Sequence, residues 1–257
     1  MLLWESMAAQ KQFSESHFGA RLDTLFTSLD GTELSGRYSD RAIRETWIHR
    51  NAGIRWGLAG SNTDTAEAAI WNVAHAALTH SDMRTLTVNT HASANLTHNS
   101  AYISGCSTAF VLGVAALING VDLSDMRSYM LSLRDDLEIH QRTCSNDVMF
   151  QIANEAALLG ADANLEVDPI IACRLIGMNC TMSFQVPSAY FLLHRFADDF
   201  ETGVLTAINA AGNNMARAAL TGALLGASVG LQGIPKRFIE GLAEHTRLLE
   251  LCDQLTD

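Results

Sequence analysis

The stretch GNNMARAALTGALLGASVG, residues 212–230, decides the fold of this chain. Small residues recur in it at helical spacing, which would let neighbouring helices approach closely from several sides: Ala216, Ala218, Ala219, Gly222, Ala223, Gly226 and Ala227. The pattern predicts a central core helix. Gly212, Asn213 and Asn214 come directly before it, where backbone N–H groups and short polar side chains can hold a ligand. We therefore expect a binding site at the N-terminal end of this helix.

Composition limits the class of protein. The 257 residues can bury a large core, and this length favours one domain over two. A formal net charge of −11 argues against a nucleic-acid partner and favours a small-molecule or protein partner. The cysteines are odd in number and form no Cys-x-x-Cys pair, which favours free thiols in a reducing compartment, by default the cytoplasm. They are Cys106, Cys144, Cys173, Cys180 and Cys252.

The hydrophobic pattern predicts helices throughout. The chain has only three prolines, and no segment shows the sustained alternation that predicts a strand. We expect an all-α protein of about ten helices in a single compact domain, residues 1–257. Within it, residues 1–50 form divergent N-terminal helices, 5–29 and 39–51, that pack on the core. The apolar run 103–118 lacks basic flanks and contains Ser, Gly, Cys and Thr, which favours a buried helix over a membrane span.

Residues 63–78, TDTAEAAIWNVAHAAL, begin with two carboxyl side chains near a helix start. In one interpretation Asp64 caps that helix and Glu67 folds back in a capping box. In the other, these carboxylates hold a hard cation such as Mg²⁺. The polar stretch 79–99 that follows is predicted to be a long connection whose histidines, His80, His91 and His98, face solvent or cap helices.

Three segments resemble the ADP-ribosylglycohydrolase family, which includes the dinitrogenase-reductase-activating glycohydrolases and the J-crystallin-like lens proteins. Residues 183–242 are similar to it in an ordered series: an acidic-aromatic helix start, a Gly-led turn, the GALLGA helix and Ile-Pro before a last helix. Residues 97–120 resemble its Thr-His segment and long helix, and residues 63–70 its Thr-Asp-Asp-Thr metal motif. The resemblance implies an all-α domain, a two-metal Mg²⁺ or Mn²⁺ centre and hydrolysis of a glycosidic bond to ADP-ribose.

The sequence departs from this family at the metal motifs. Where the family has two Asp before the GALLGA helix, this chain has Asn213 and Met215, and a thioether is a poor ligand for Mg²⁺. In the N-terminal motif only Asp64 remains, flanked by Thr63 and Thr65. The comparison therefore predicts one Mg²⁺ or Mn²⁺ at most, held by Asp64, or no metal.

Three functions follow from these residues. The first is an enzyme that acts on a ribosyl or nucleotide-like small molecule in the family pocket, with Asp64 and Glu67 as catalytic groups. Its substrate-binding residues are then Thr63, Thr65, His98, Asn99, Gly212, Asn213, Asn214 and Arg217. The second is a catalytically inactive binding or structural relative of the crystallin kind. The third is a magnesium-dependent isoprenoid cyclase, suggested by the acidic motifs 135–138, 198–201 and 146–147. Neither nucleic acid nor a membrane is expected as a partner, and the oligomeric state is left open.

Overall fold

The computed structural model describes residues 1–34, 38–143 and 147–256. Fifteen α-helices and one 3-10 helix account for most of these residues, and no strand occurs among them. The helices are α1 (Leu2–Gln10), α2 (Glu15–Phe26), α3 (Arg41–Asn51), α4 (Glu67–Thr79), α5 (Met83–Thr97), α6 (Ala101–Ile118), α7 (Leu123–Ser132), η1 (Leu133–Asp135), α8 (Leu137–Thr143), α9 (Asp147–Ala161), α10 (Pro169–Ile176), α11 (Met182–Arg195), α12 (Phe200–Asn209), α13 (Asn214–Gly233), α14 (Lys236–Glu240) and α15 (His245–Thr256). The all-α prediction is confirmed.

Helix α6 forms the centre of the core. Almost its whole length is buried, and it packs against α4, α5 and α13. Its length and apolar composition would suit a membrane span, but 83% of it is buried inside the protein, as expected of the core helix of a globular domain. The sequence prediction of a buried helix here is confirmed.

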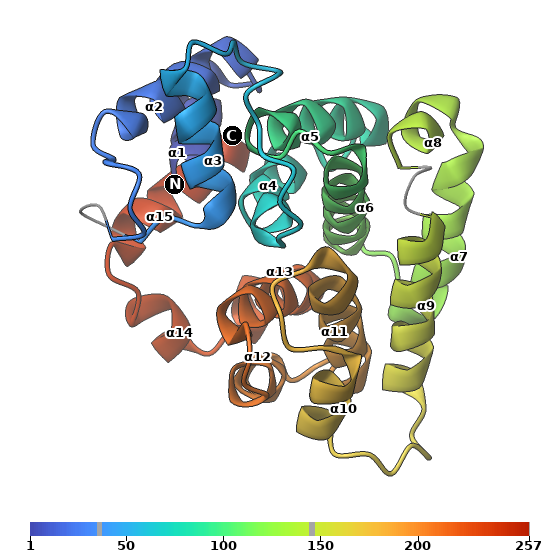
Figure 1. Ribbon diagram of the computed structural model, residues 1–257. Coiled ribbons are helices and arrows are strands. Elements are labelled where there is room, and N and C mark those ends of the chain that lie inside the picture. Colours follow the sequence, from blue (N-terminus) through green and yellow to red (C-terminus); the bar gives the residue numbers. More distant parts are fainter. Residues whose placement is uncertain (35–37, 144–146, 257) are drawn as a thin grey trace.

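The other helices surround α4, α5 and α6 (Figure 1). Helices α1, α2, α3 and α15 lie together on one side, where α1 contacts α2, α4 and α15, and α2 and α3 contact α5. Helices α10 to α13 form a second group, in which α11 and α13 pack on α6, and α9 packs along α11. The chain thus places the starts of α4 and α13 close enough for these two helices to contact each other.

Helix α13 contacts four other helices, α4, α6, α11 and α12. Its residues are buried or half-buried over most of the length before the kink at Gly230, and the residues after the kink are exposed. A Cβ atom added at Gly222 would meet its nearest neighbour at 3.7 Å, an ordinary contact, so this small residue is not needed for packing. The close approach occurs on the partner helix instead, because a Cβ at Gly203 of α12 would lie 2.4 Å from Leu225. The predicted core helix with neighbours on several sides is therefore present, although Gly222 itself makes no close approach.

Several predicted boundaries also differ. The polar stretch 79–99 contains helix α5, because Asp82 caps its start by accepting N–H bonds from Arg84 and Thr85, and small polar residues such as Thr87 and Ser93 are buried along it. The predicted helix 5–29 is two helices, separated where Lys11 adopts a left-handed conformation. These breaks explain why the described residues contain more helices than predicted.

Candidate functional site

The segment from Gly177 to Thr181, which we call the 177–181 loop, joins α10 to α11 and contacts both predicted motifs. On one side, Asn213 donates its backbone N–H to the Met178 carbonyl at 2.7 Å. On the other side, Ala66 donates its N–H to the Cys180 carbonyl at 2.9 Å. Residues separated by more than a hundred positions in the sequence therefore lie on the two sides of one short loop. Apart from its place between two predicted helices, nothing in the sequence indicates the role of this loop.

Asp64 binds the start of α11, immediately after the loop. Its Oδ1 accepts the N–H of Met182 at 3.0 Å, a position where the helix dipole favours a negative charge. The carboxyl is half-buried, and this burial raises its pKa although the N–H of Met182 opposes the rise. Helix α4 itself begins at Glu67 without a side-chain cap. The predicted capping of α4 by Asp64 is therefore wrong, because the carboxyl caps α11 instead.

Glu67 presents a second carboxyl with a raised pKa. It is the first residue of α4, and its buried Oε2 has no hydrogen-bond partner. Burial is the main cause of the rise, and the nearby carboxyl of Asp40 adds to it. Asp40 caps α3 by accepting the N–H of Ile43 at 3.0 Å, and burial raises its pKa as well. Asp40 falls inside the predicted helix 39–51, and the sequence does not show that its carboxyl lies near Glu67.

Thr63 and Thr65 are both held by internal hydrogen bonds. Thr63 donates its hydroxyl to Oε2 of Glu45 at 2.9 Å, and Ser61 donates to the same oxygen. Thr65 lies with its hydroxyl oxygen 3.0 Å from Nε2 of His98. These contacts fix the segment that carries Asp64.

His98 is fully buried, so the prediction that it faces solvent is wrong. It does end a helix, because it is the C-cap residue of α5 and donates its backbone N–H to the Ala94 carbonyl at 2.8 Å. Its Nδ1 lies 3.1 Å from the hydroxyl oxygen of Thr97, and its ring contacts Trp71 in a tilted arrangement with 5.7 Å between centroids. Burial lowers its pKa to about 4, so the ring is neutral at pH 7. The predicted neighbour Asn99 is exposed. His98 thus positions Thr65, and Asn99 alone of the two reaches solvent.

The polar groups of the turn before α13 form hydrogen bonds within the protein. Gly212 has a φ of 65°, and an added Cβ would lie 2.3 Å from the Met178 carbonyl oxygen, so the loop requires glycine here. Asn213 caps α13 by accepting the N–H of Ala216 at 3.1 Å, and the exposed Asn214 donates to the Ile208 carbonyl at 3.2 Å. Met215 is 55% exposed. The amide of Asn213 therefore already has a structural partner.

The sequence predicts that Arg217 binds substrate, but in the structure its side chain is turned into the protein. Its side chain is 0% exposed, and its guanidinium donates to the carbonyls of Ala207 at 3.2 Å, Ala211 at 2.9 Å and Gly177 at 3.2 Å. These carbonyls end α12 and α10, where the helix dipoles favour a cation. The predicted substrate-binding role of Arg217 is therefore corrected: it is a structural arginine that links two helix ends and the 177–181 loop to α13.

The residues at the family's metal positions do not fit a two-metal centre. Among the described residues, no group of three or more His, Cys, Asp or Glu side chains could hold a metal ion. Asp64 and Asn213 each use Oδ1 to cap a helix, and Met215 offers a soft thioether to a hard cation. These residues therefore do not support a reaction that depends on a pair of metal ions.

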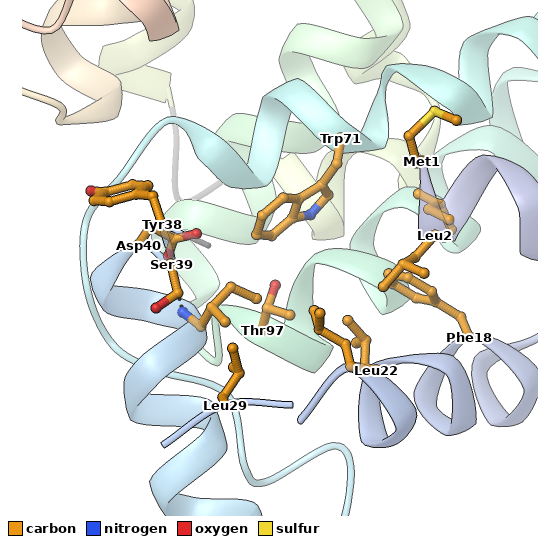
Figure 2. A pocket seen from close by; sticks show the side chains of 13 residues that line it. Met1, Leu2, Phe18, Leu22, Leu29, Tyr38, Ser39, Asp40, Trp71 and Thr97 are labelled. Atoms are coloured by element: carbon orange, nitrogen blue, oxygen red, sulfur yellow. Dashed lines mark hydrogen bonds between the residues drawn. The ribbon is translucent and has the colours of Figure 1, made fainter. Parts of the chain in front are cut away.

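An apolar cavity of about 320 Å³ is lined by residues of the N-terminal helices and by Trp71 of α4 (Figure 2). This N-terminal cavity is bounded by Phe18, Leu22 and Ile43, with Trp71 over its middle and Asp40 at one end. The Trp71 ring also contacts the His98 ring, so one indole ring connects the cavity to the Thr65 contact. Sequence reasoning missed the cavity, because its wall comes from five helices, α1 to α5, whose packing the pattern does not specify.

The sequence model of the ADP-ribosylglycohydrolase family matches residues 1–257. The chain belongs to this family. A protein described only as uncharacterized from Archaeoglobus fulgidus is 27% identical over 255 residues, which cover 99% of this chain and 77% of the relative. A solved structure called an ADP-ribosylglycohydrolase-related protein complex aligns with a TM-score of 0.71 at 18% identity, over 99% of this chain and 77% of that chain. This structural likeness shows a shared fold.

Membership of the ADP-ribosylglycohydrolase family removes the basis of the isoprenoid cyclase alternative. Its acidic motifs have local structural partners: Asp136 pairs with Arg84, and Asp199 caps α12 by accepting the N–H of Thr202 at 2.9 Å. Asn146, in the third motif, lies outside the described residues. These carboxylates stabilise helix starts of a family member whose motif residues meet at the 177–181 loop.

Proposed function

We propose that this family member hydrolyses a glycosidic bond of a ribosyl or nucleotide-like small molecule beside the 177–181 loop, using carboxyl groups without a metal pair. The observation that carries the proposal is the pair Asp64 and Glu67, two carboxyls with raised pKa near one loop. Glycoside hydrolysis commonly needs one carboxylic acid and one carboxylate, and unequal environments assign these roles.

Glu67 suits the role of general acid. Burial and the Asp40 carboxyl both favour its protonated form, and its buried Oε2 has no competing partner. In the proposed step, Glu67 gives its proton to the leaving atom as the glycosidic bond breaks. The leaving group thus departs in neutral form.

Asp64 suits the role of general base. The N–H of Met182 stabilises its ionised form, and this carboxylate takes a proton from the water whose oxygen attacks the anomeric carbon. One water is consumed, and the proton gained by Asp64 returns to Glu67 through solvent after product release. Thr63 and Thr65, fixed by Glu45 and His98, hold Asp64 in place.

Turnover of a substrate panel tests these roles. The panel contains ADP-ribosyl-arginine, ADP-ribose derivatives and nicotinamide dinucleotides. Asp64→Asn and Glu67→Gln should each lower kcat at least about 100-fold, whereas Asp82→Asn, which changes an exposed carboxyl that caps α5, should leave kcat unchanged. Equal rates in all three variants would contradict the proposal. Calorimetry that finds two tightly bound Mn²⁺ ions per chain would contradict it as well.

The alternative is a catalytically inactive binding or structural relative. It is favoured by the turn before α13, where Asn213 and Arg217 serve the fold. Ligand-induced thermal shifts without turnover of any member of the panel would support it. For the compartment we keep the cytoplasm as a proposal, which is supported by the four described cysteines, none of which is in a disulfide; Cys144 lies outside the described residues.

A further inference from the structure

The N-terminal cavity has an apolar body and one charged end. Phe18, Leu22 and Ile43 are buried residues that supply apolar walls. Asp40 carries the only carboxylate among the described residues that line the cavity. Figure 2 shows Tyr38 and Asp40 at one end and Phe18 and Leu22 toward the other. A ligand that fits this cavity therefore has an apolar chain and a single polar head.

Aromatic rings accompany the carboxyl at the charged end. Trp71 presents its ring over the middle of the cavity, and Tyr38, which is 66% exposed, lies at the same end as Asp40. Cations bind to the faces of Trp and Tyr rings, most strongly where water is excluded. A carboxylate beside two aromatic rings is a typical arrangement for an ammonium group.

Several carboxylates make this end of the cavity electronegative. The pKa of Tyr38 is raised by burial and also by the charges of Asp40, Glu67 and Glu33, against the opposing charge of Arg44. Arg44 is itself paired with Glu33 at 3.1 Å. The net charge of −11 has the same sign, so the local and the overall fields both attract a cation.

We propose that the N-terminal cavity binds a small alkylammonium ion, with its ammonium group beside Asp40 and its alkyl chain against Leu22. The cavity of about 320 Å³ has roughly twice the volume of an apolar cavity of ~150 Å³ that holds benzene. An unbranched chain of about eight carbons is therefore a suitable probe. This binding does not depend on the proposed glycosidic chemistry.

Calorimetric titration of the whole chain with n-octylammonium chloride tests the proposal, with 1-octanol as the uncharged probe of equal chain length. One n-octylammonium ion should bind per chain, at least about tenfold more tightly than 1-octanol. Asp40→Asn should remove this difference while keeping the α3 cap, because an Asn side chain also accepts the N–H of Ile43. Equal affinity for both probes, or an unchanged preference in Asp40→Asn, would overturn the proposal.

A second variant locates the bound chain. Leu29→Trp places a larger side chain at the cavity wall and should weaken both probes at least about tenfold. Leu231→Trp, at a residue of α13 that is 57% exposed, is the matched control and should bind as the wild type does. Binding that survives Leu29→Trp unchanged, or the absence of saturable binding in the wild type, would refute a site in this cavity.

Discussion

The two sides of the 177–181 loop use polar side chains differently. On the Asp64 side, Asp64 and Glu67 are partly buried carboxyls with raised pKa, and Oε2 of Glu67 has no partner. On the Asn213 side, Asn213 caps α13 and Arg217 is bound to carbonyls at two helix ends. The Asp64 side thus has groups that can exchange protons, while the polar side chains on the Asn213 side form hydrogen bonds that stabilise the fold.

The two motif segments therefore have different roles: the Asn213 segment stabilises the fold, and the Asp64 segment carries ionisable groups. Exchanging a carboxylate for the amide of Asn213 removes a charge but keeps an acceptor for the N–H of Ala216. The turn and its helix therefore persist without the metal ligands. Substitutions on the Asn213 side should change stability, and substitutions on the Asp64 side should change activity and the pH dependence of stability.

Arg217→Met should cause the largest loss. It should lower the free energy of unfolding by about 4 kcal/mol, because the carbonyls of Ala207, Ala211 and Gly177 lose a buried charged partner. Urea unfolding measures this loss. The control is Arg174→Met, which removes one exposed arginine with a single bond of 3.1 Å to the Ala210 carbonyl and should cost less than about 1 kcal/mol. Wild-type stability in Arg217→Met, together with lost substrate binding, would show that Arg217 serves the ligand instead.

His98 should give the Asp64 side a stability that depends on pH. Burial lowers its pKa to about 4, below the ordinary value of about 6.5, so the unfolded chain binds more protons between these two values. The free energy of unfolding is therefore highest above pH 6.5 and decreases as the pH falls. His98 alone should lower it by about 2 kcal/mol at pH 5. Buried His75, with a pKa of about 3, contributes in the same direction.

Urea unfolding at pH 7 and pH 5 isolates the contribution of His98. His98→Gln keeps groups that can hydrogen-bond to Thr65 and should reduce the difference between the two pH values by about 2 kcal/mol. His80→Gln changes a histidine whose bond to Asn119 is exposed, and should leave the difference unchanged. An unchanged difference in His98→Gln would mean that His98 takes up its proton in the folded protein.

The fold could be predicted from the sequence because its signals are local. The apolar run 103–118 specified the buried helix α6, and Asp168 before Pro169 marked the start of α10. Helix α5 was missed because it is polar: its Thr and Ser side chains are buried against neighbouring helices, and tertiary packing overrides the weak propensity of such residues. Pro187 lies inside α11 and not in the first turn that proline favours, since Asp64 stabilises an earlier start at Met182.

The candidate site was less predictable because its contacts are distant in sequence. The motif comparison located Asp64, Glu67 and the turn before α13, which lie around one loop. It could not show that Asp64 caps a helix more than a hundred residues away, or that Arg217 reaches backbone carbonyls. These roles depend on where helix ends meet, and no spacing rule within a single helix contains that information.

The smallest expected effect is a gain of stability on the Asp64 side. The pKa of Glu67 is raised in the folded protein. The protonated carboxyl therefore contributes fully to stability below the ordinary pKa of Glu, and this contribution is lost as the pH rises through the pKa that Glu67 has in the folded protein. Glu67→Gln cannot ionise, so it should raise the free energy of unfolding at pH 7 by up to about 1 kcal/mol and leave it unchanged near pH 4. Asn213→Asp makes the opposite change, amide to carboxyl, on the other side of the loop. It should change the free energy of unfolding by less than about 0.5 kcal/mol, because either side chain caps α13. A loss of stability at pH 7 in Glu67→Gln would show that the folded protein requires the carboxylate, and the two sides of the loop would then be alike.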